Sequence, residues 1–545
     1  MPSAPDVSSW PADRSVPLFD RSVGALLRDA AAAHGDTVAL VGVPDGGRPR
    51  QEWTYRELLA EAESVAAGLL QRVGRGDKVA IWAPNVARWP VFAYAAALAG
   101  TTLVTLNPAL RADGLEHALR VSGASLLLHA EHERDRDMAA VVHEVTPRLP
   151  ALRHVVPLSA WDSLRASGPL PTDEEVRAVP AQLQFTSGTT GTPKAVLLSH
   201  RAVVNVARLT FEGLGVPQGV TVVSPLPMFH TAGCVISSLG PLWSGGTFVL
   251  MERFHPLAVL EVLRESPGAL LTSVPTVLTS LCEVAAAARG PRPVLSAVLT
   301  GAAPVRAQLI LETEELFSTT VFNLYGQTET ASVLTLTRPE DSAELKTTTV
   351  GRPLPHAEVR VVDPATGRVQ PFGVQGEICA RGYQQMLAYH GDEEATARKV
   401  DADGWLHTGD LGSMGADGTL RVAGRLDDLI IRGGENISPA AIEEMLCTLP
   451  EVRDAVVVGV PDDKYGEVVA AVLQPAAGSA GPAAVTLLAE CARRLPPNMV
   501  PAALYLAEDL PLTSSGKIQR FRVRELLLAG LLRDLTDRPV ATARA

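Results

Sequence analysis

Short apolar stretches alternate with longer Ala/Leu-rich segments along residues 20–330, and this alternation constrains the fold more than any other feature. KVAIWAP, ASLLLHA, TVVSPLP, GTFVLM and SAVLTGAAP have the length of strands, whereas RELLAEAESVAAGLLQRV has the length and composition of a helix. Strands that alternate with helices pair in parallel, because each helix returns the chain to the same edge of the sheet. The pattern predicts an α/β fold with parallel sheets.

The pattern changes twice further along the chain. Residues 350–424 contain short alternating stretches, AEVRVVD, GEICARG and GTLRVAG, separated by the turn sequences DPATG, ADG and GADG. This arrangement is typical of β-hairpins or a small barrel. After Gly424, helical stretches such as AAIEEMLCTL again alternate with apolar ones such as AVVVGVPD. We therefore predict a domain boundary near Asp427, with domains at residues 1–426 and 427–545.

Composition limits the partners and the compartment. A hydrophobic share of 46% and a charged share of 20% are typical of a globular protein, and 545 residues exceed one ordinary core. The net charge of −12 argues against nucleic acid as the main partner. Five widely spaced cysteines without a CxxC pair indicate neither a disulfide framework nor a zinc site, which favours the cytoplasm.

The N-terminal segment and the longest uncharged segment each have a simple interpretation. The start, MPSAPDVSSWPADRSV, is polar and Pro-rich and predicts a loose tail rather than a secretory signal. The longest uncharged stretch, residues 89–110, is interrupted by Pro and Gly, so we expect a buried helix and a strand rather than a transmembrane segment.

Residues 185–200, FTSGTTGTPKAVLLSH, place Lys194 in a Thr/Ser/Gly loop between an apolar strand and the expected start of a helix. Small hydroxyl residues and glycines let donors converge on an anion, so a polyphosphate is the first candidate ligand. Pro193 and Ala195 exclude a Walker loop, which has Gly before its Lys and Ser or Thr after it. Only six of the 48 basic residues are lysines, which makes a lysine here notable. A polar turn without ligand is the alternative.

Five further polar motifs follow in order: PMFHTAG (227–233), NLYGQTET (323–330), GWLHTGDL (404–411), GRLDDLIIRGGENISP (424–439) and PLTSSGKIQR (511–520). With FTSGTTGTPK they closely resemble the motifs of the adenylate-forming superfamily, which includes acyl-CoA synthetases, aryl-CoA ligases, peptide-synthetase adenylation domains and firefly-type luciferases. The resemblance extends from WTYRELL (53–59) to PLTSSGKIQR, and it is greatest to a stand-alone acyl- or aryl-CoA ligase.

The resemblance implies a fold and a reaction. The fold is a large N-terminal domain of two parallel-sheet α/β subdomains plus a small β-barrel-like subdomain, followed by a small mobile α+β domain. In the reaction, a carboxylate attacks the α-phosphate of ATP to give an acyl-adenylate and pyrophosphate, and a thiol such as that of CoA takes the acyl group. Hydroxyls, amides, lysines and Mg²⁺ suit this chemistry, because it depends on positioning and charge neutralisation.

The resemblance also assigns residues to the phosphates and the adenine. The family usually has Gly where this chain has Ala195, a mild departure next to the loop. The β- and γ-phosphates are expected to contact Thr186, Ser187, Gly188, Thr189, Thr190, Gly191 and Lys194. The adenine is expected to contact Tyr325, Gly326, Gly301, Ala302 and Ala303. A tight strand-to-helix turn is the alternative for the last three.

The polar residues of the later motifs receive roles in the same way. Thr328 is expected to contact the α-phosphate, and Glu329 to hold Mg²⁺, which prefers oxygen ligands. Asp410 is expected to accept hydrogen bonds from both ribose hydroxyls, with a turn-capping aspartate as the alternative. Arg425 is expected on the ribose or phosphate side. Lys517 matches the lysine that bridges carboxylate and phosphate oxygens during adenylation.

Three further positions are expected to control access and movement. His230 matches the gate of the carboxylate pocket, and a structural histidine is the alternative. Asp427 matches the hinge about which the C-terminal domain rotates between the two half-reactions. Gly433 and Gly434 resemble the loop that lines the pantetheine tunnel, although two glycines also suit a plain turn.

By resemblance, the acyl pocket is lined by residues 230–243 and 273–278 with Gly301 to Ala303. Residues 230–243 and 273–278 contain no charged side chain that would pair with an ammonium group. A hydrophobic fatty or aryl acid is therefore the expected substrate.

Alternative functions stay open at this point. One is an adenylating enzyme that passes the adenylate to a carrier protein, an amine or another acceptor, or that activates a small non-carboxylate oxyanion. Another is a non-catalytic nucleotide-binding module, which the presence of Glu329, Asp410 and Lys517 disfavours. A homodimer is also left open, because the sequence does not determine the oligomeric state.

Overall fold

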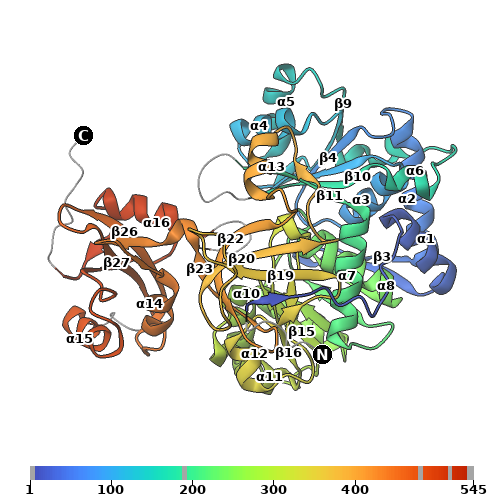
Figure 1. Cartoon of the computed structure of the whole chain (residues 1–545). Coiled ribbons are helices and arrows are strands. Elements are labelled where there is room, and N and C mark those ends of the chain that lie inside the picture. The colour runs from blue at the N-terminus through green and yellow to red at the C-terminus, as the bar shows by residue number, and fades with distance from the viewer. Residues whose placement is uncertain (1–6, 187–192, 477–482, 513–517, 537–545) are drawn as a thin grey trace, which may run out of the picture.

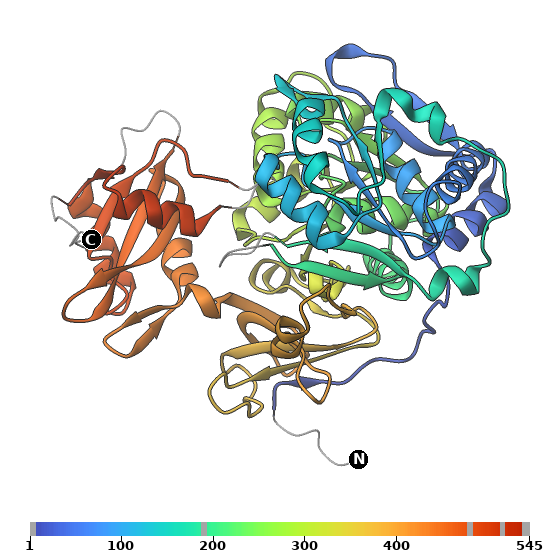
Figure 2. The same cartoon turned by 90° about the horizontal axis from the view of Figure 1, so that it is seen from above.

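The computed structural model describes residues 7–186, 193–476, 483–512 and 518–536. Within these ranges the chain forms four large sheets, three in an N-terminal body and one in a smaller C-terminal lobe that stands apart from it (Figures 1 and 2). The predicted α/β class with parallel sheets is confirmed. No helix among the described residues has the length and apolar character needed to cross a membrane.

The first sheet has seven strands, of which five pair in parallel and the two at one edge pair antiparallel. The prediction of a helix and then a strand within residues 89–110 is confirmed by α3 (Arg88–Leu98) and β5. The strand order is β21 (Ala388–Tyr389), β11 (Ala195–Ser199), β10 (Pro180–Phe185), β5 (Thr102–Thr105), β4 (Lys78–Trp82), β6 (Leu126–His129) and β9 (His154–Pro157).

The second sheet has nine strands, and the six from β16 to β2 pair in parallel. The strand order is β18 (Arg352–Pro353), β17 (Thr335–Leu336), β16 (Val321–Tyr325), β15 (Ala297–Gly301), β14 (Leu270–Thr272), β12 (Thr221–Ser224), β13 (Thr247–Met251), β2 (Val38–Val43) and β3 (Gln51–Thr54).

The two parallel sheets share one hydrophobic core, and side chains alternate along the six parallel strands of the second sheet to reach it. Val222 and Phe248 belong to the shared cluster, whereas their neighbours Val223 and Val249 belong to a cluster on the opposite face. The shared cluster includes α1 (Val23–His34), α2 (Tyr55–Leu70), α3, α7 (His200–Leu214) and α8 (Ser238–Ser244). The opposite cluster includes α9 (Pro256–Glu265), α10 (Pro275–Ala287) and α11 (Ala307–Phe317).

The third sheet is antiparallel and forms the small β subdomain. Its strands are β1 (Ser9–Trp10), β19 (Ala357–Val362), β20 (Gly376–Gly382), β22 (Leu406–Met414) and β23 (Leu420–Arg425). The prediction of a loose N-terminal tail was wrong at β1, where Ser9 and Trp10 pair with Arg360 and Val359. Trp10 packs on the core of this sheet, and the N-terminal segment follows the body to reach it (Figure 2).

The C-terminal lobe is an α+β unit. Its sheet contains β25 (Glu435–Ile437), β24 (Ile430–Arg432), β27 (Gly466–Pro475), β28 (Ala503–Leu506) and β29 (Arg533–Asp534), with β26 (Val452–Asp462) beside β27. Helices α14 (Pro439–Leu446) and α15 (Ala484–Arg494) share a core with one face, and α16 (Arg520–Leu528) with the other. The lobe begins after the short turn η6 (Leu426–Asp428), which contains Asp427.

The connection of the Thr/Ser/Gly loop differs from the prediction. The loop joins β10 to β11 as the turn of an antiparallel hairpin, and helix α7 follows only after β11. The backbone N–H of Thr186 donates to the carbonyl oxygen of Lys194 at 2.9 Å and closes this hairpin. The stretch AVLLS stands where the start of a helix was expected, but it pairs with strands on both sides.

Candidate active site

Residues from all three sheets of the N-terminal body meet where several strands end. Tyr325 is the last residue of β16, Arg425 is the last residue of β23, and Lys194 directly precedes β11. Hydrogen bonds and ring contacts connect these positions into two groups, one around Asp410 and one around Glu329.

Asp410 is a buried carboxylate with partners on both oxygens. The Tyr325 hydroxyl donates to Oδ2 at 2.7 Å, and Nε of Arg425 donates to Oδ1 at 2.9 Å. Burial, and then the neighbouring Asp410 charge, raise the pKa of Tyr325 well above its usual value, so the phenol stays protonated and donates. Tyr325, Asp410 and Arg425 come from three different strands, and the resemblance assigns all three to the nucleotide.

Glu329 is a second buried carboxylate, and a tyrosine holds it. It lies in the short turn η5 (Thr328–Thr330), and its Oε1 accepts a hydrogen bond of 2.7 Å from the Tyr389 hydroxyl. Nζ of Lys194 lies 4.9 Å from the centre of the Tyr389 ring, within the range of a cation–π interaction. The structure therefore links the lysine of the hairpin loop to the carboxylate of the YGQTE motif through one tyrosine.

Lys399 ends helix α13 (Glu393–Lys399) and donates from Nζ to the carbonyl oxygen of Thr408 at 2.9 Å. Burial lowers the pKa of its amine, while the charges of Glu329 and Asp410 oppose that effect. The amine therefore lies within electrostatic reach of both carboxylates.

Neither Tyr389 nor Lys399 was predicted from the sequence. MLAYH contains no motif signal, and the contact between Tyr389 and Glu329 spans 60 residues of chain. The rarity of lysine was a usable signal for Lys399, since it is one of only six in the chain.

The backbone around the expected adenine position is restricted. Gly301 has φ of +156°, and a Cβ there would lie 2.4 Å from the carbonyl oxygen of Leu324. Ala302 has φ of +64°, a left-handed conformation that a non-glycine residue adopts at a cost. A Cβ on Gly326 would lie 2.1 Å from the carbonyl oxygen of Ser332. Ala303 follows in the same turn before α11. Residues 301–303 therefore form a tight strand-to-helix turn, and this turn is compatible with the expected contact to adenine.

His230 lies at the start of a π-helical turn, η4 (Ala232–Ser237), which leads into α8. Its ring centre lies 4.4 Å from that of Phe229, and the Thr105 hydroxyl donates to the Phe229 carbonyl at 3.0 Å. Such π turns occur frequently at functional sites. Deeper in this segment, the Ser237 hydroxyl lies 3.0 Å from Ser224 Oγ and 2.9 Å from Thr272 Oγ1, so these buried hydroxyls satisfy one another.

The remaining predicted positions lie outside this group or outside the described ranges. Asp427 lies in η6, two residues beyond Arg425. Gly433 and Gly434 form the two-residue turn between β24 and β25 with φ of +59° and +88°, as a tight hairpin requires. Residues outside the described ranges are Ser187, Gly188, Thr189, Thr190, Gly191 and Lys517.

The donor set fits a magnesium-bound nucleotide. Glu329 and Asp410 supply hard carboxylate oxygens, and both are less than 10% exposed, at 7% and 6%. Lys194, Lys399 and Arg425 place positive charge around them. A site of this kind binds hydroxyls through one carboxylate, a hard cation through the other, and phosphate oxygens through the cations.

Known proteins match this chain over nearly its full length. Residues 27–390 match the family model of the AMP-binding enzymes, and residues 441–517 match that of the AMP-binding enzyme C-terminal domain. YngI of Bacillus subtilis (strain 168), whose name provisionally describes an acyl-CoA synthetase, is 34% identical over 540 residues, covering 93% of this chain and 97% of YngI.

Two other known proteins match a similar share of this chain. The mitochondrial medium-chain acyl-CoA ligase ACSF2 of Macaca fascicularis is 31% identical over 545 residues, covering 93% of this chain and 87% of the relative. The o-succinylbenzoate CoA synthetase MenE of Bacillus subtilis, solved with an acyl-adenylate intermediate, has a TM-score of 0.79 at 29% identity and covers 92% of this chain and 97% of its own. This chain therefore belongs to the AMP-binding enzymes of the adenylate-forming superfamily and is an AMP-forming acid–thiol ligase of the acyl-CoA synthetase type.

Proposed function

We propose that the protein activates a hydrophobic fatty or aryl carboxylic acid with ATP, releases pyrophosphate, and transfers the acyl group from the adenylate to CoA. The observation that carries this proposal is that Lys194 contacts Tyr389, Tyr389 holds Glu329, and the amine of Lys399 lies within electrostatic reach of both Glu329 and Asp410, so that three sheets bring cations and two carboxylates together. The acyl-CoA ligase names of the relatives support CoA as the acceptor.

Each residue of the site has a defined task in this proposal. Asp410, oriented by Tyr325 and Arg425, accepts the ribose hydroxyls. Glu329 holds Mg²⁺, which when bound neutralises charge on the phosphates. Thr328, Lys194, and the loop from Thr186 to Gly191 bind phosphate oxygens, and Gly301 to Ala303 with Gly326 border the base. Lys517 contacts the reacting carboxylate.

The two domains divide the chemistry. Residues 1–426 bind ATP and the acid, and residues 427–545 rotate at Asp427 so that Lys517 serves adenylation and the turn at Gly433 and Gly434 serves thioester formation. Among the described residues, Ser438 Oγ donates to the Ala423 carbonyl at 2.5 Å and Arg306 donates to the Arg453 carbonyl at 3.2 Å across this boundary. Sparse polar contacts of this kind suit a joint that moves.

The substrate class rests on the lining of the expected acyl pocket. Residues 230–243 and 273–278 contain no Asp, Glu, Lys or Arg, and the hydroxyls of Ser224, Ser237 and Thr272 bond to one another rather than facing a ligand unpaired. A charged substrate group would lie there without a partner at considerable cost, so an apolar acyl chain or ring suits the pocket. His230 gates its entrance.

We also propose that the protein acts in the cytoplasm. All five cysteines are free, as a reducing cytoplasm permits. Light scattering of the purified chain measures directly whether the protein forms a homodimer.

The test is pyrophosphate release from MgATP with saturated fatty acids of graded length, benzoates and small polar acids, each with and without CoA, with products identified by mass. We expect an acyl-CoA product from one hydrophobic class. Asp410→Asn serves as the inactive control because it removes one acceptor charge from the ribose site. Pyrophosphate release without a CoA adduct would instead favour a carrier protein, an amine or another acceptor, and ATP binding without release would refute catalysis.

A further inference from the structure

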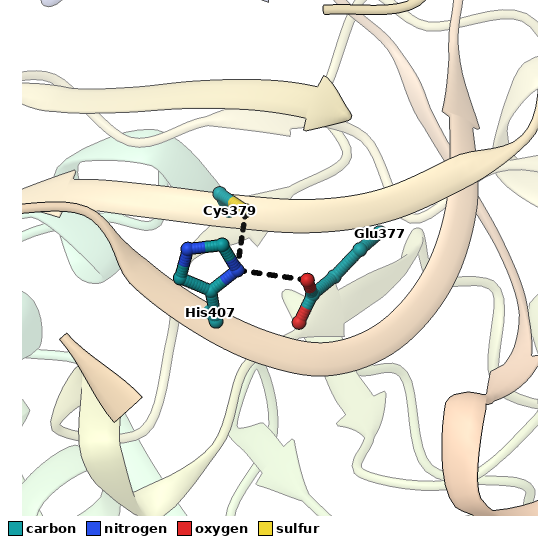
Figure 3. Close-up of side chains that lie close together, drawn as sticks. All are labelled: Glu377, Cys379 and His407. Carbon is teal, nitrogen blue, oxygen red and sulfur yellow. Dashed lines mark hydrogen bonds and ion pairs between the residues drawn. The ribbon is translucent and has the colours of Figure 1, made fainter. Parts of the chain in front are cut away.

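Three potential metal ligands lie together in the β subdomain, and one of them, His407, belongs to the GWLHTGDL motif (Figure 3). Glu377 and Cys379 are two residues apart on β20 and point to one side of the sheet, and His407 on β22 is the cross-strand partner of Cys379. His407 Nδ1 lies 2.8 Å from Glu377 Oε2 and 3.5 Å from Cys379 Sγ. All three ligand atoms lie within 4.8 Å of one another, close enough for one ion to contact each.

The cluster is enclosed on one side and accessible on the other. Cys379 is fully buried and Glu377 is 7% exposed, whereas the His407 side chain is 30% exposed. An ion held here would be shielded by protein on the side of the thiol and reachable by solvent along the imidazole. That combination leaves a fourth coordination position for water, as in zinc sites with three protein ligands.

The surroundings of His407 provide a second, independent indication. Its other ring nitrogen, Nε2, lies 3.5 Å from Asp401 Oδ2, so both nitrogens face carboxylates. A neutral imidazole has one N–H and one lone pair, so it donates to only one of them. With N–H on Nε2 directed to Asp401, the Nδ1 lone pair faces the Glu377 carboxylate and the Cys379 sulfur, and either a proton or a metal ion between them joins these groups.

Asp401 is itself held in place. It accepts hydrogen bonds from the backbone N–H groups of Trp405 at 2.8 Å and Asp403 at 3.0 Å, and from Arg360 at 3.1 Å. A carboxylate that orients the far nitrogen of a metal-bound histidine is a recurring feature of zinc sites.

We propose that Glu377, Cys379 and His407 bind one thiophilic divalent transition-metal ion of the zinc class, with His407 coordinating through Nδ1. A ligand set of one sulfur, one nitrogen and one oxygen selects such an ion over Mg²⁺ or Ca²⁺, which take oxygen ligands. The site is thus chemically distinct from the magnesium position proposed at Glu329.

The thiol must lose its proton when the ion binds. Burial raises the pKa of Cys379 to about 12, with a further contribution from Glu377, while the Arg360 guanidinium acts in the opposite direction. A coordinated divalent ion overcomes this effect, because it replaces the proton on sulfur. With the thiol proton released to solvent, the two negative charges of the thiolate and Glu377 balance the two positive charges of the ion.

Binding at this cluster preserves the neighbouring turn. Glu377 Oε1 accepts a hydrogen bond of 3.0 Å from the backbone N–H of Gly409, next to Asp410, whereas the oxygen that faces His407 is Oε2. One carboxylate therefore serves the turn and the ion with different oxygens.

The test uses the full-length protein after removal of metals with a chelator. Co²⁺ is added and absorption is recorded, since thiolate coordination gives a sulfur-to-cobalt charge-transfer band in the near ultraviolet and tetrahedral geometry gives strong visible bands. We expect saturation at one equivalent and displacement by Zn²⁺. Cys379→Ser should abolish the charge-transfer band, and His407→Gln should weaken Zn²⁺ affinity roughly ten- to hundredfold or more.

Cys447→Ser is the matched control, because Cys447 is the least buried of the five cysteines and lies outside the cluster; this variant should keep the band. Absence of a thiolate band in the wild-type protein would overturn the proposal without reliance on any variant. The same conclusion follows if the band persists in Cys379→Ser, or if nuclear magnetic resonance shows protons on both ring nitrogens of His407 in the presence of Zn²⁺.

Discussion

Replacing Tyr389 by Phe tests whether the tyrosine positions Glu329 for adenylation. The substitution removes one oxygen, which donates to Glu329 Oε1 at 2.7 Å, and retains the ring that lies 4.9 Å from Nζ of Lys194. The cation–π contact is therefore kept while the carboxylate loses its donor. Any change in rate then reports on the hydrogen bond alone.

The expected magnitude follows from the nature of this hydrogen bond. Hydrogen bonds to charged groups contribute about 1.5 to 3 kcal/mol, and a tenfold rate change corresponds to roughly 1.4 kcal/mol. We expect kcat/KM for adenylation to fall roughly ten- to hundredfold, because Glu329 is buried and no longer fixed. The KM for Mg²⁺ should rise, while thioester formation from supplied acyl-adenylate should be unchanged.

Tyr383→Phe provides a matched control. The Tyr383 hydroxyl is also buried but has no hydrogen-bond partner among the described residues, so its removal costs no hydrogen bond. ATP–pyrophosphate exchange at several Mg²⁺ concentrations measures the first half-reaction in both variants. If Tyr389→Phe and Tyr383→Phe show the same Mg²⁺ dependence, the positioning role of Tyr389 is refuted.

Three other predictions concern the lysine, the hinge and a buried histidine. Lys517→Ala should slow adenylation roughly a hundredfold to a thousandfold and spare thioester formation from supplied acyl-adenylate; equal loss of both half-reactions would contradict its assignment. Asp427→Pro should retain pyrophosphate exchange and block thioester formation, and loss of exchange would count against the hinge. Burial lowers the pKa of His200 from 6.5 to about 4, so the unfolded chain binds the proton first and stability falls as pH drops from 6.5 to 4. The free energy of unfolding, measured with urea, should fall by about 3 kcal/mol over this pH range. His200→Gln has no titrating group at this position, so its free energy of unfolding should depend less on pH. An unchanged pH dependence in this variant would refute His200 as the cause.

The sequence predicted the parallel sheets and the order of the motifs, because both are local patterns. It did not predict the hairpin at the Thr/Ser/Gly loop, since AVLLS is equally compatible with a strand and with the first turn of a helix. Only pairing with β10 and β21, which the sequence does not specify, decides in favour of a strand. Trp10 was missed for the same reason, since its partner Val359 lies 349 residues away in the chain and no local signal connects them.

Within the site, residue types were easier to predict than their contacts. Asp410, Glu329 and Lys194 were identified from motif resemblance, whereas Tyr389, which contacts two of these elements, lies in an unremarkable stretch. The Glu377, Cys379 and His407 cluster was missed because cysteine spacing indicates a metal site only when the ligands are close in sequence. These three residues instead come from two strands. The contacts of Tyr389 and the assembly of the Glu377 cluster both depend on how strands pair, and sequence patterns specify that register only weakly here.

The position of Arg425 is compatible with the proposed rotation at Asp427, because it allows the proposed nucleotide site to stay intact. Arg425 is paired with Asp410 across β22 and β23, both in backbone register and through its side chain at 2.9 Å. Asp427 lies two residues later in η6, outside that sheet. The proposed rotation at Asp427 would therefore move the C-terminal lobe while β23 stays paired with β22. In the proposed function, Asp410 and its two partners would therefore stay assembled in either orientation, and only groups beyond residue 427 would exchange between the steps.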